Sequence, residues 1–358
     1  MELGARKLKI LQAVIEAYIQ TGEPVGSKAL CELLDVSVSF GHFTPAWRAV
    51  PVSSATIRNE MASLSELGLL EQPHTSAGRI PTQFGYRLYI NELMKPKPLS
   101  DEEMRYIDGY LSEYADDPDL LLEKAAEMLA EMTKYAAIST TPTNRDATIQ
   151  RIQLVQTGPH TAMLVLTTST GAVKSKLFRT NYLLNSDILR MFSNVLNEKM
   201  GSVHLLNVTP DFIKSTAFSI GELSLMMAPV FVALGQACRE VLKTNVLLEG
   251  RTNLLYLPEY EVDSVKRLLH FLEQRGELAK LIGAQKEKLG VLIGGESNQP
   301  EMIDTSVVLV RYSMGRQTRG TLGVIGPTRM DYPKIVSNLQ YLAQSVGGML
   351  NEIMDVGV

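Results

Sequence analysis

This sequence of 358 residues has few cysteines, few long apolar runs and no large surplus of charge of one sign. The two cysteines, Cys31 and Cys238, have neither a CxxC partner nor a Cys/His spacing, so the sequence supports no disulfide framework and no zinc site. We therefore expect a protein of the reducing cytoplasm. The net charge is −4, and residues 1–95 hold nine Lys or Arg against nine Asp or Glu, so bulk charge does not indicate nucleic-acid binding. Any DNA contact must come from the local arrangement of residues.

No stretch predicts a membrane span or a secretion signal. The most apolar segment, Leu223 to Leu234, is shorter than the ~18 apolar residues that a spanning helix needs, and Glu222 and Gln236 close it. We interpret it as a buried or partner-facing helix. The N-terminal residues mix charge with apolar side chains and contain no apolar core or small-residue cleavage site, so we expect no signal peptide.

The sequence patterns of catalysis are missing as well. Gly320, Gly323 and Gly326 match neither G-x-G-x-x-G nor a GK[ST] phosphate loop. The five histidines form no HExxH pair, and there is no G-x-S-x-G elbow. We therefore expect a protein that is not an enzyme and that requires no cofactor and no metal.

The first 95 residues have the pattern of a small helical domain that ends in a hairpin. Apolar residues recur at helical spacing over residues 4–20, and Ser27 and Ser53 stand where helix caps are expected. The helix that starts at Ser53 has one apolar face, formed by Ile57, Met61 and Leu64.

Two short extended pieces follow that third helix. Residues 69–73 and 79–81 flank the polar, Gly-containing tip 74–78, which predicts a β-hairpin. Thr82 then caps a further helix that continues to Met94.

Three helices followed by a hairpin are the element order of a winged helix-turn-helix. Such a domain places the N-terminal end of its third helix in the major groove, where free amides and short polar side chains meet phosphates and base edges. Arginine can contact guanine or phosphate, asparagine can pair with adenine, and alanine can touch a thymine methyl group. The hairpin would lie along the DNA backbone or the minor groove. The candidate DNA-binding residues are Ser53, Ser54, Ala55, Thr56, Arg58, Asn59, His74, Thr75, Ser76 and Arg79.

A purely structural interpretation of this region stays open. Ser53 can be only a cap, Arg58 only a surface charge, and the hairpin only a small sheet that closes a helical bundle.

The rest of the chain alternates between helical and extended patterns. The prolines of Lys95-Pro-Lys-Pro98 predict a linker, because they stop a helix and favour extended backbone. The patterns that follow are helical at 100–135, extended from Ile149, helical at 185–243 and 261–283, extended again between Val291 and Met330, and helical from Tyr332. Sheet, helical block and sheet in this order suggest an insertion inside one α+β domain.

Two long segments carry a family resemblance. Residues 53–94, which begin SSATIRNEMASL, and residues 320–347, which begin GTLGVIGPTRM, closely resemble the HrcA family of bacterial heat-inducible transcription repressors, as does EPVGSKAL upstream. The resemblance implies a homodimeric repressor of chaperone operons that binds an inverted-repeat operator in double-stranded DNA. It also implies that the GroEL chaperonin keeps the repressor active.

The resemblance implies a fold as well: a winged helix-turn-helix domain and a GAF-like α/β domain with an inserted dimerisation domain. We expect the DNA-binding domain at 1–95, linker helices and the first part of the GAF-like domain at 96–199, the inserted domain at 200–285, and the second part of the GAF-like domain at 286–358.

One segment departs from the family pattern. Residues Phe40 to Pro51 lengthen the connection between the second and third helices and contain the only tryptophan. We interpret them as a loop that folds on its own apolar residues. A contact with DNA or a partner through His42, Trp47 and Arg48 is the alternative.

A different mode of control also stays open. The GAF-like domain could bind a small effector, with Met314, Arg316 and Arg329 lining the pocket, and this alternative rests on fold analogy alone.

Overall fold

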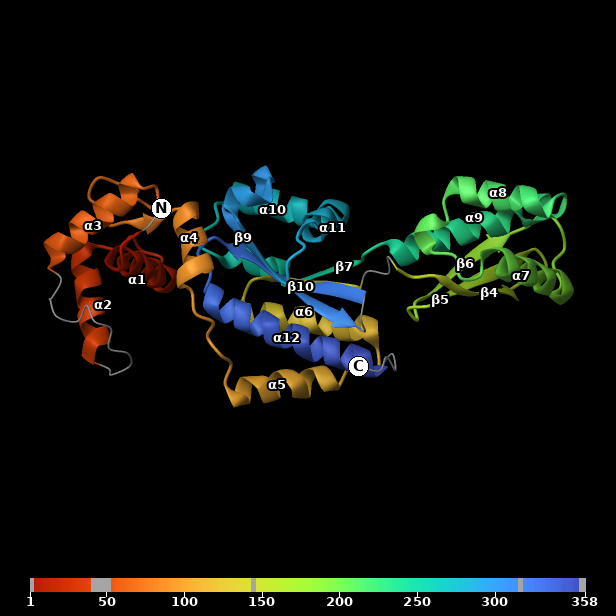
Figure 1. Ribbon diagram of the computed structural model, residues 1–358, viewed down its shortest axis with the longest axis horizontal. Coiled ribbons are helices and arrows are strands. Elements are labelled where there is room, and N and C mark those ends of the chain that lie inside the picture. Colours follow the sequence, from red (N-terminus) through yellow and green to blue (C-terminus); the bar gives the residue numbers. More distant parts are fainter. Residues whose placement is uncertain (1–2, 40–52, 143–145, 315–317, 354–358) are drawn as a thin grey trace.

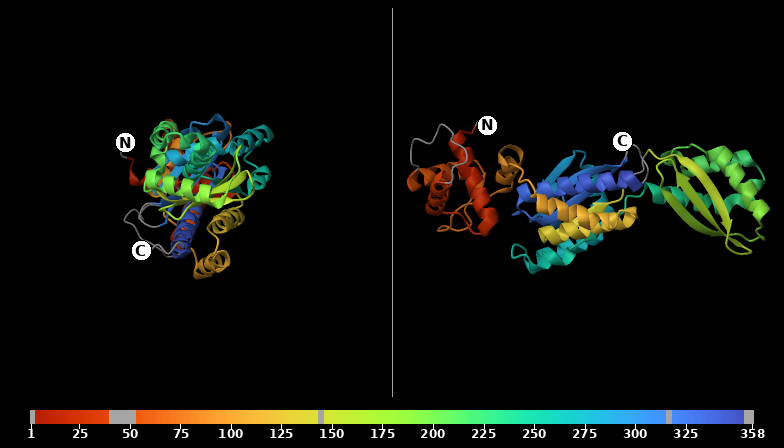
Figure 2. Two further views of the ribbon diagram at one scale, coloured as in Figure 1. Left: turned by 90° about the vertical axis from the view of Figure 1, so that its right-hand side faces the viewer. Right: turned by 90° about the horizontal axis from the view of Figure 1, so that it is seen from below.

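The structure is a computed structural model that describes residues 3–39, 53–142, 146–314 and 318–353. The described chain forms three units in a row (Figure 1). An N-terminal head lies at one end, a unit built around a five-stranded sheet lies in the middle, and an insert lies at the other end, as the second panel of Figure 2 also shows. The expected mixture of helix and sheet, α+β, is confirmed.

The head is a bundle of helices with a two-stranded hairpin. Its elements are α1 (Ala5–Thr21), α2 (Ser27–Ser39), α3 (Ser54–Glu66), β1 (Leu70–Glu71), β2 (Ile80–Pro81), α4 (Gln83–Leu88) and the π-helical turn η1 (Tyr89–Leu93). The predicted apolar face of α3 is buried, with Ile57 and Leu64 fully inaccessible to solvent against Leu11, Ile15 and Leu30. Helical spacing of the apolar residues therefore determines how α3 packs.

The middle unit has three layers. Its elements are α5 (Asp101–Ser112), α6 (Pro118–Thr133), β3 (Ala136–Thr140), β7 (Val246–Glu249), η3 (Arg251–Tyr256), α10 (Val262–Glu273), α11 (Arg275–Ala284), β8 (Leu289–Ile293), η4 (Gly294–Ser297), η5 (Pro300–Met302), β9 (Thr305–Met314), β10 (Thr318–Pro327) and α12 (Tyr332–Ile353). The sheet is antiparallel throughout, in the order β7-β3-β10-β9-β8. Helices α6 and α12 cover one face and α10 and α11 cover the other (Figure 1).

The inner strands of this sheet have no polar face, because helices cover both sides. All five residues of β3 are buried, as are the first six of β9. The three glycines of β10 make room for neighbouring side chains: a Cβ at Gly320 would lie 2.2 Å from the Tyr312 hydroxyl, and one at Gly323 would lie 2.5 Å from Leu309. These glycines therefore serve packing.

The insert has a sheet and a core of its own. Its elements are β4 (Ile149–Gln156), β5 (Thr161–Thr168), β6 (Val173–Arg179), α7 (Ser186–Met200), η2 (Leu205–Asn207), α8 (Pro210–Ile220) and α9 (Leu223–Leu242). Burial alternates along β5, as expected for a sheet that is packed on one side only. The buried side chains between Ala147 and Val241 form a cluster separate from those of the head and the middle unit.

The limits of the insert differ from those expected. The sequence placed strands 149–179 in the main sheet and residues 246–285 in the insert. In the structure, β4–β6 pair only with one another, while β7, α10 and α11 belong to the middle unit. The chain enters the insert after Thr141 and leaves it before Asn245, and these two residues hydrogen-bond to each other. The prediction failed because the pattern of a strand shows its exposed and buried sides and does not show its pairing partner.

Helix α9 is longer than the apolar run in the sequence. It has 20 residues, and its length and composition alone would allow it to cross a membrane. The core helix of a protein with no membrane span can pass the same test. Half of its most apolar stretch is buried inside the insert, as in a helix that packs in a protein core. The predicted role as a buried helix fits this half, and the other half leaves Leu225 and Val232 exposed.

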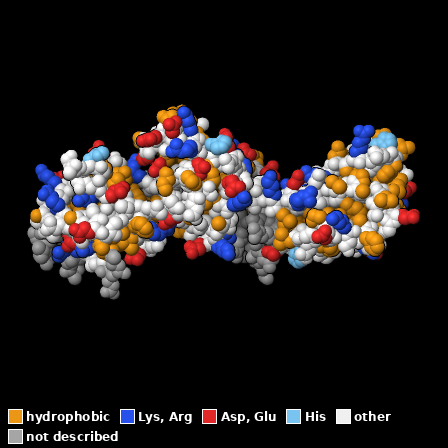
Figure 3. All heavy atoms as spheres, turned by 90° about the horizontal axis from the view of Figure 1, so that it is seen from above, with side chains coloured by type: hydrophobic (Ala, Val, Ile, Leu, Met, Phe, Trp, Pro, Cys, Tyr) orange, Lys and Arg blue, Asp and Glu red, His pale blue; other side chains and the backbone are white. Residues whose placement is uncertain are grey.

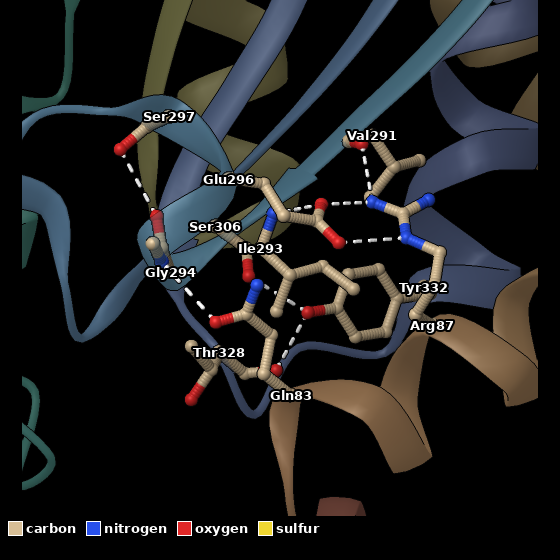
Figure 4. Close-up of polar contacts among 11 residues, drawn as sticks. Gln83, Arg87, Val291, Ile293, Gly294, Glu296, Ser297, Ser306, Thr328 and Tyr332 are labelled. Atoms are coloured by element: carbon tan, nitrogen blue, oxygen red, sulfur yellow. Dashed lines mark hydrogen bonds and ion pairs between the residues drawn. The ribbon is translucent and has the colours of Figure 1, made fainter.

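Polar contacts connect the head to the middle unit at two points. Arg87 of α4 forms an ion pair with Glu296 and donates a 2.7 Å hydrogen bond to the Val291 carbonyl, next to Gln83, which accepts from the Gly295 amide (Figure 4).

The second contact lies at the end of α1. Arg329 forms an ion pair with Glu259 and donates a 2.7 Å hydrogen bond to the Ile19 carbonyl. Both pairs are largely shielded from solvent, with side chains 19–29% exposed. Together with a continuous apolar core, they fix the head on the middle unit.

Candidate nucleic-acid interface

The N-terminal end of α3 presents short polar side chains to solvent. Ser53 caps the helix, because its hydroxyl accepts a 3.2 Å hydrogen bond from the Thr56 amide and lies 3.0 Å from the Thr56 hydroxyl. Ser54, Arg58 and Asn59 are exposed, while the opposite face is buried. The buried face fixes the rotation of α3, so this exposed row has a defined direction.

The hairpin stands beside α3 with an ordered tip. Strands β1 and β2 pair with Leu70 opposite Pro81 and Glu71 opposite Ile80. The Gln72 side chain donates two 3.0 Å hydrogen bonds, to the carbonyls of Thr75 and Ala77, and thereby holds the turn together.

A backbone bridge ties the hairpin to the residues before α2. Val25 and Arg79 exchange two backbone hydrogen bonds of 2.9 Å. The contact is tight, because a Cβ at Gly78 would lie 2.4 Å from the Val25 carbonyl carbon. The start of α2, the side of α3 and the hairpin thus surround a cavity of about 430 Å³.

The ten residues predicted to bind DNA fall into two groups. Those of α3 and its cap form one exposed surface, and those of the hairpin form a second surface beside it. Arg58 and Arg79 both line the cavity between the two groups, and His74 lies at the exposed tip. The structure thus brings residues that are about 20 positions apart in sequence to one side of the head.

Other candidates from the sequence are not brought together. Met314 ends β9 at one end of the β9–β10 hairpin, and Arg329 follows β10 at the other end, and the ten-residue strands between them span about 30 Å. Arg329 is also held by Glu259 and the Ile19 carbonyl. The proposed effector pocket of Met314, Arg316 and Arg329 is therefore wrong as a set, and Arg316 lies outside the described residues. His42, Trp47 and Arg48 also lie outside them.

Sequence reasoning missed the residues that position the site. Gln72, Val25 and Gly78 order the hairpin, and the Arg87–Glu296 and Arg329–Glu259 pairs hold the head. The close approach at Gly78 could be suspected from a glycine next to a strand. The ion pairs leave no local signal, because Arg87 and Glu296 are 209 positions apart.

Within the described ranges, no group of three or more His, Cys, Asp or Glu side chains is placed to hold a metal ion.

Comparison with known proteins identifies a family. The model of the HrcA protein C-terminal domain matches residues 119–336. The heat-inducible transcription repressor HrcA of Ruminiclostridium cellulolyticum is 33% identical over 362 residues, covering all of both chains. That of Thermobifida fusca is 36% identical over 350 residues, or 97% of each chain.

A solved crystal structure of a hypothetical protein shares the fold. Its TM-score is 0.57 at 24% identity, over 98% of this chain and 100% of that one. Since full-length relatives above 30% identity bear one name and the family model covers more than half of the chain, this protein belongs to the HrcA family of heat-inducible transcription repressors.

Proposed function

We propose that the head is a winged helix-turn-helix that binds an inverted-repeat operator in double-stranded DNA, and that the repressor thereby controls heat-shock chaperone operons. The observation that carries this proposal is the capped N-terminal end of α3, whose exposed polar row lies beside an ordered hairpin. A helix of this width fits the major groove, and its free amides favour phosphate.

The residues divide by the chemistry they offer. Ser53, Ser54 and Thr56 at the start of α3 supply hydroxyl groups to phosphates, and Ala55 offers a methyl group to thymine. Asn59 is exposed on the side of α3 opposite the buried face and can pair with adenine. His74, Thr75 and Ser76 at the hairpin tip reach the DNA backbone or minor groove.

A footprint of the purified protein on the DNA upstream of its own operon tests operator binding. Asn59→Ala should lose ~1–3 kcal/mol of operator affinity, because a bidentate pair with adenine is removed. Gln20→Ala is the matched control: it removes an exposed amide at the C-terminal end of α1, outside the proposed DNA-binding residues, and should leave operator affinity unchanged. Wild-type affinity in the Asn59→Ala protein would contradict the role given to α3.

We propose further that the insert forms a homodimer, which an inverted-repeat site requires. Of the seventeen exposed large apolar side chains in the described part of the chain, ten lie in the insert. Figure 3 displays apolar side chains spread over this unit. They are Val155, Val173, Leu177, Leu183, Met191, Leu206, Phe218, Leu225, Met226 and Val232. Such a concentration favours burial against a second copy.

Sedimentation tests the homodimer. Phe218 is 91% exposed in the insert and Tyr256 is 83% exposed in the middle unit. Phe218→Glu together with Leu225→Glu should give a monomer with weakened operator binding, whereas Tyr256→Glu should stay dimeric. The opposite result would move the interface to the middle unit.

The middle unit, in this proposal, is the GAF-like domain, and GroEL sets the active fraction of the repressor. The support is the family resemblance and a sheet in which β3 pairs with β7 and β10, both of which follow the whole insert in sequence; such distant pairings slow folding and expose apolar surface meanwhile. Chaperonin added to refolding protein should raise the fraction that shifts operator DNA, and an unfolded competitor should reverse the gain. An active fraction that responds to a small metabolite and not to chaperonin would contradict this mechanism.

A further inference from the structure

Hydrogen-bond donors are prominent in the lining of the cavity between α2, α3 and the hairpin. Two arginines, Arg58 and Arg79, face it together with the hydroxyl residues Ser27, Thr75 and Ser76. No Asp or Glu of the described ranges lines it. Hydroxyl and guanidinium groups around one hollow are the donor set that phosphate oxygens require.

Neither arginine side chain forms a hydrogen bond or ion pair with another described residue. The Arg79 Nε is buried and has no hydrogen-bond partner there. The Arg58 side chain is exposed at the rim of the cavity, and the structure gives it no hydrogen bond or ion pair with a described residue. A buried donor without an acceptor destabilises the folded state, and an incoming anion would supply the missing acceptor.

The start of α2 adds positive potential at the same place. Gly26 and Ser27 line the cavity, and the Gly26 carbonyl accepts the first helical hydrogen bond, from the Leu30 amide at 3.0 Å. The amides of the first turn of a helix have no partner within the helix, so they favour an anion.

We propose that this cavity binds one phosphate of the DNA backbone, held between Arg58 and Arg79. The proposal rests on the proposed operator binding and assigns these two arginines a role. A phosphate protrudes from the duplex and can enter a hollow, whereas a base edge lies inside the groove and is reached by projecting side chains. Arg58 lies on the flank of α3, beside the buried Met61 and next to the hairpin, while Asn59 is directed outward.

The proposal makes Arg58 a residue that positions the head and Asn59 the residue that reads sequence. Loss of a phosphate contact lowers the affinity for every DNA sequence by a similar factor. Each such contact contributes about one to the slope of log affinity against log salt concentration. Arg58→Ala and Arg79→Ala should each lower affinity roughly tenfold on both the operator and a scrambled duplex of equal length. Each should also reduce the salt slope by about one.

The experiment measures fluorescence anisotropy of full-length protein on both duplexes across a salt series. Arg58→Lys is the conservative variant and should keep the slope. Asn59→Ala should lose affinity for the operator alone, and Arg190→Ala, an exposed arginine of the insert, should match the wild type. Circular dichroism confirms that each variant is folded.

Three results would overturn the assignment. If Arg58→Ala weakens the operator but not the scrambled duplex and keeps the salt slope, Arg58 reads a base. If the slope is unchanged and inorganic phosphate raises the melting temperature of the wild type but not of Arg58→Ala, the cavity holds a free anion. If the wild type binds neither duplex, both the proposed operator binding and the phosphate site are rejected. The first two results reject only the phosphate site and leave operator binding intact.

Discussion

Gly78 leaves no room for a side chain where the hairpin meets the residues before α2. A Cβ there would lie 2.4 Å from the Val25 carbonyl atoms and 2.7 Å from the Pro24 carbonyl carbon, and backbone cannot move aside like the end of a side chain. Gly78→Ala should therefore break the Val25–Arg79 bridge or displace the hairpin. We expect a loss of ~1–3 kcal/mol in the free energy of unfolding, measured by urea titration, and weaker operator binding.

Gly109→Ala is the matched control for that change. A Cβ at Gly109 meets nothing within 4 Å, and alanine is a better helix former than glycine. It should raise the stability of α5 by up to about 1 kcal/mol. Equal effects of the two substitutions would show that the Gly78 contact does not constrain the hairpin.

Glu296 connects pH to the attachment of the head. Burial raises the pKa of this carboxyl, but hydrogen bonds from Arg87 and from the Ile293 amide outweigh it, so its pKa lies below the ordinary 4.5. A carboxyl with a lowered pKa stabilises the folded state above its unfolded pKa, and this contribution is lost as pH falls through the folded pKa.

Urea titrations at several pH values test this linkage. We expect the stability of the wild type to decline as pH falls below about 4.5, with part of that decline due to Glu296. Glu296→Gln should be less stable at neutral pH by about 1 kcal/mol and should show a shallower acid decline. Parallel curves for the two proteins would exclude Glu296 as a contributor.

At the scale of single elements, the head could be predicted from sequence and the sheet partners could not. The Ser53 cap and the apolar face of α3 act within a few residues, so the pattern itself contains the information. The strands at 149–179 alternate correctly, yet alternation is the same whichever strand lies alongside. Of the candidate site, the exposed residues were predictable, whereas the cavity was not, because it depends on Gly26 and Arg79 approaching each other in space.

Helix α1 depends on a residue that is 310 positions away. Arg329→Ala would remove the hydrogen bond to the Ile19 carbonyl and leave Glu259, whose Oε2 is already buried without a partner in the described residues, as an unpaired charge. We expect a loss of ~2–4 kcal/mol in unfolding free energy, because one partner of a shielded pair is removed. Hydrogen exchange should accelerate in the last turn of α1 before the rest of the head.

The solvent-exposed pair of Arg190 and Asp187 provides the comparison. Its side chains are 76% and 79% exposed, so Arg190→Ala should change stability by less than about 0.5 kcal/mol. If Arg329→Ala is equally mild, the apolar core alone holds the head in place.

At the scale of the whole molecule, we expect that the insert can be removed without unfolding the rest. Thr141 and Asn245 form two hydrogen bonds of 3.0 Å, and the cluster inside the insert is separate from the other two. A chain in which residues 142–244 are replaced by a short Gly-containing turn should keep the β3–β7 pairing and fold. Circular dichroism and cooperative urea unfolding check the fold, and sedimentation should show a monomer.

The turn should be made in three lengths, the first design and versions with one and two additional glycines. A collapsed or aggregated product from all three would contradict that prediction. The control is the full-length chain under identical refolding conditions.

The same insertion also delays the synthesis of β10 relative to that of its neighbour β3. The hydrogen bond from the Thr321 amide to the Thr140 hydroxyl joins residues that are 181 positions apart. At ~5–20 residues per second, roughly 10–40 s of synthesis separate the two. During that interval β3, all of whose residues end up buried, has no second neighbour, although the insert can already fold. Until β10 has been made, one edge of β3 therefore stays open in each new chain, and slower translation prolongs that exposure.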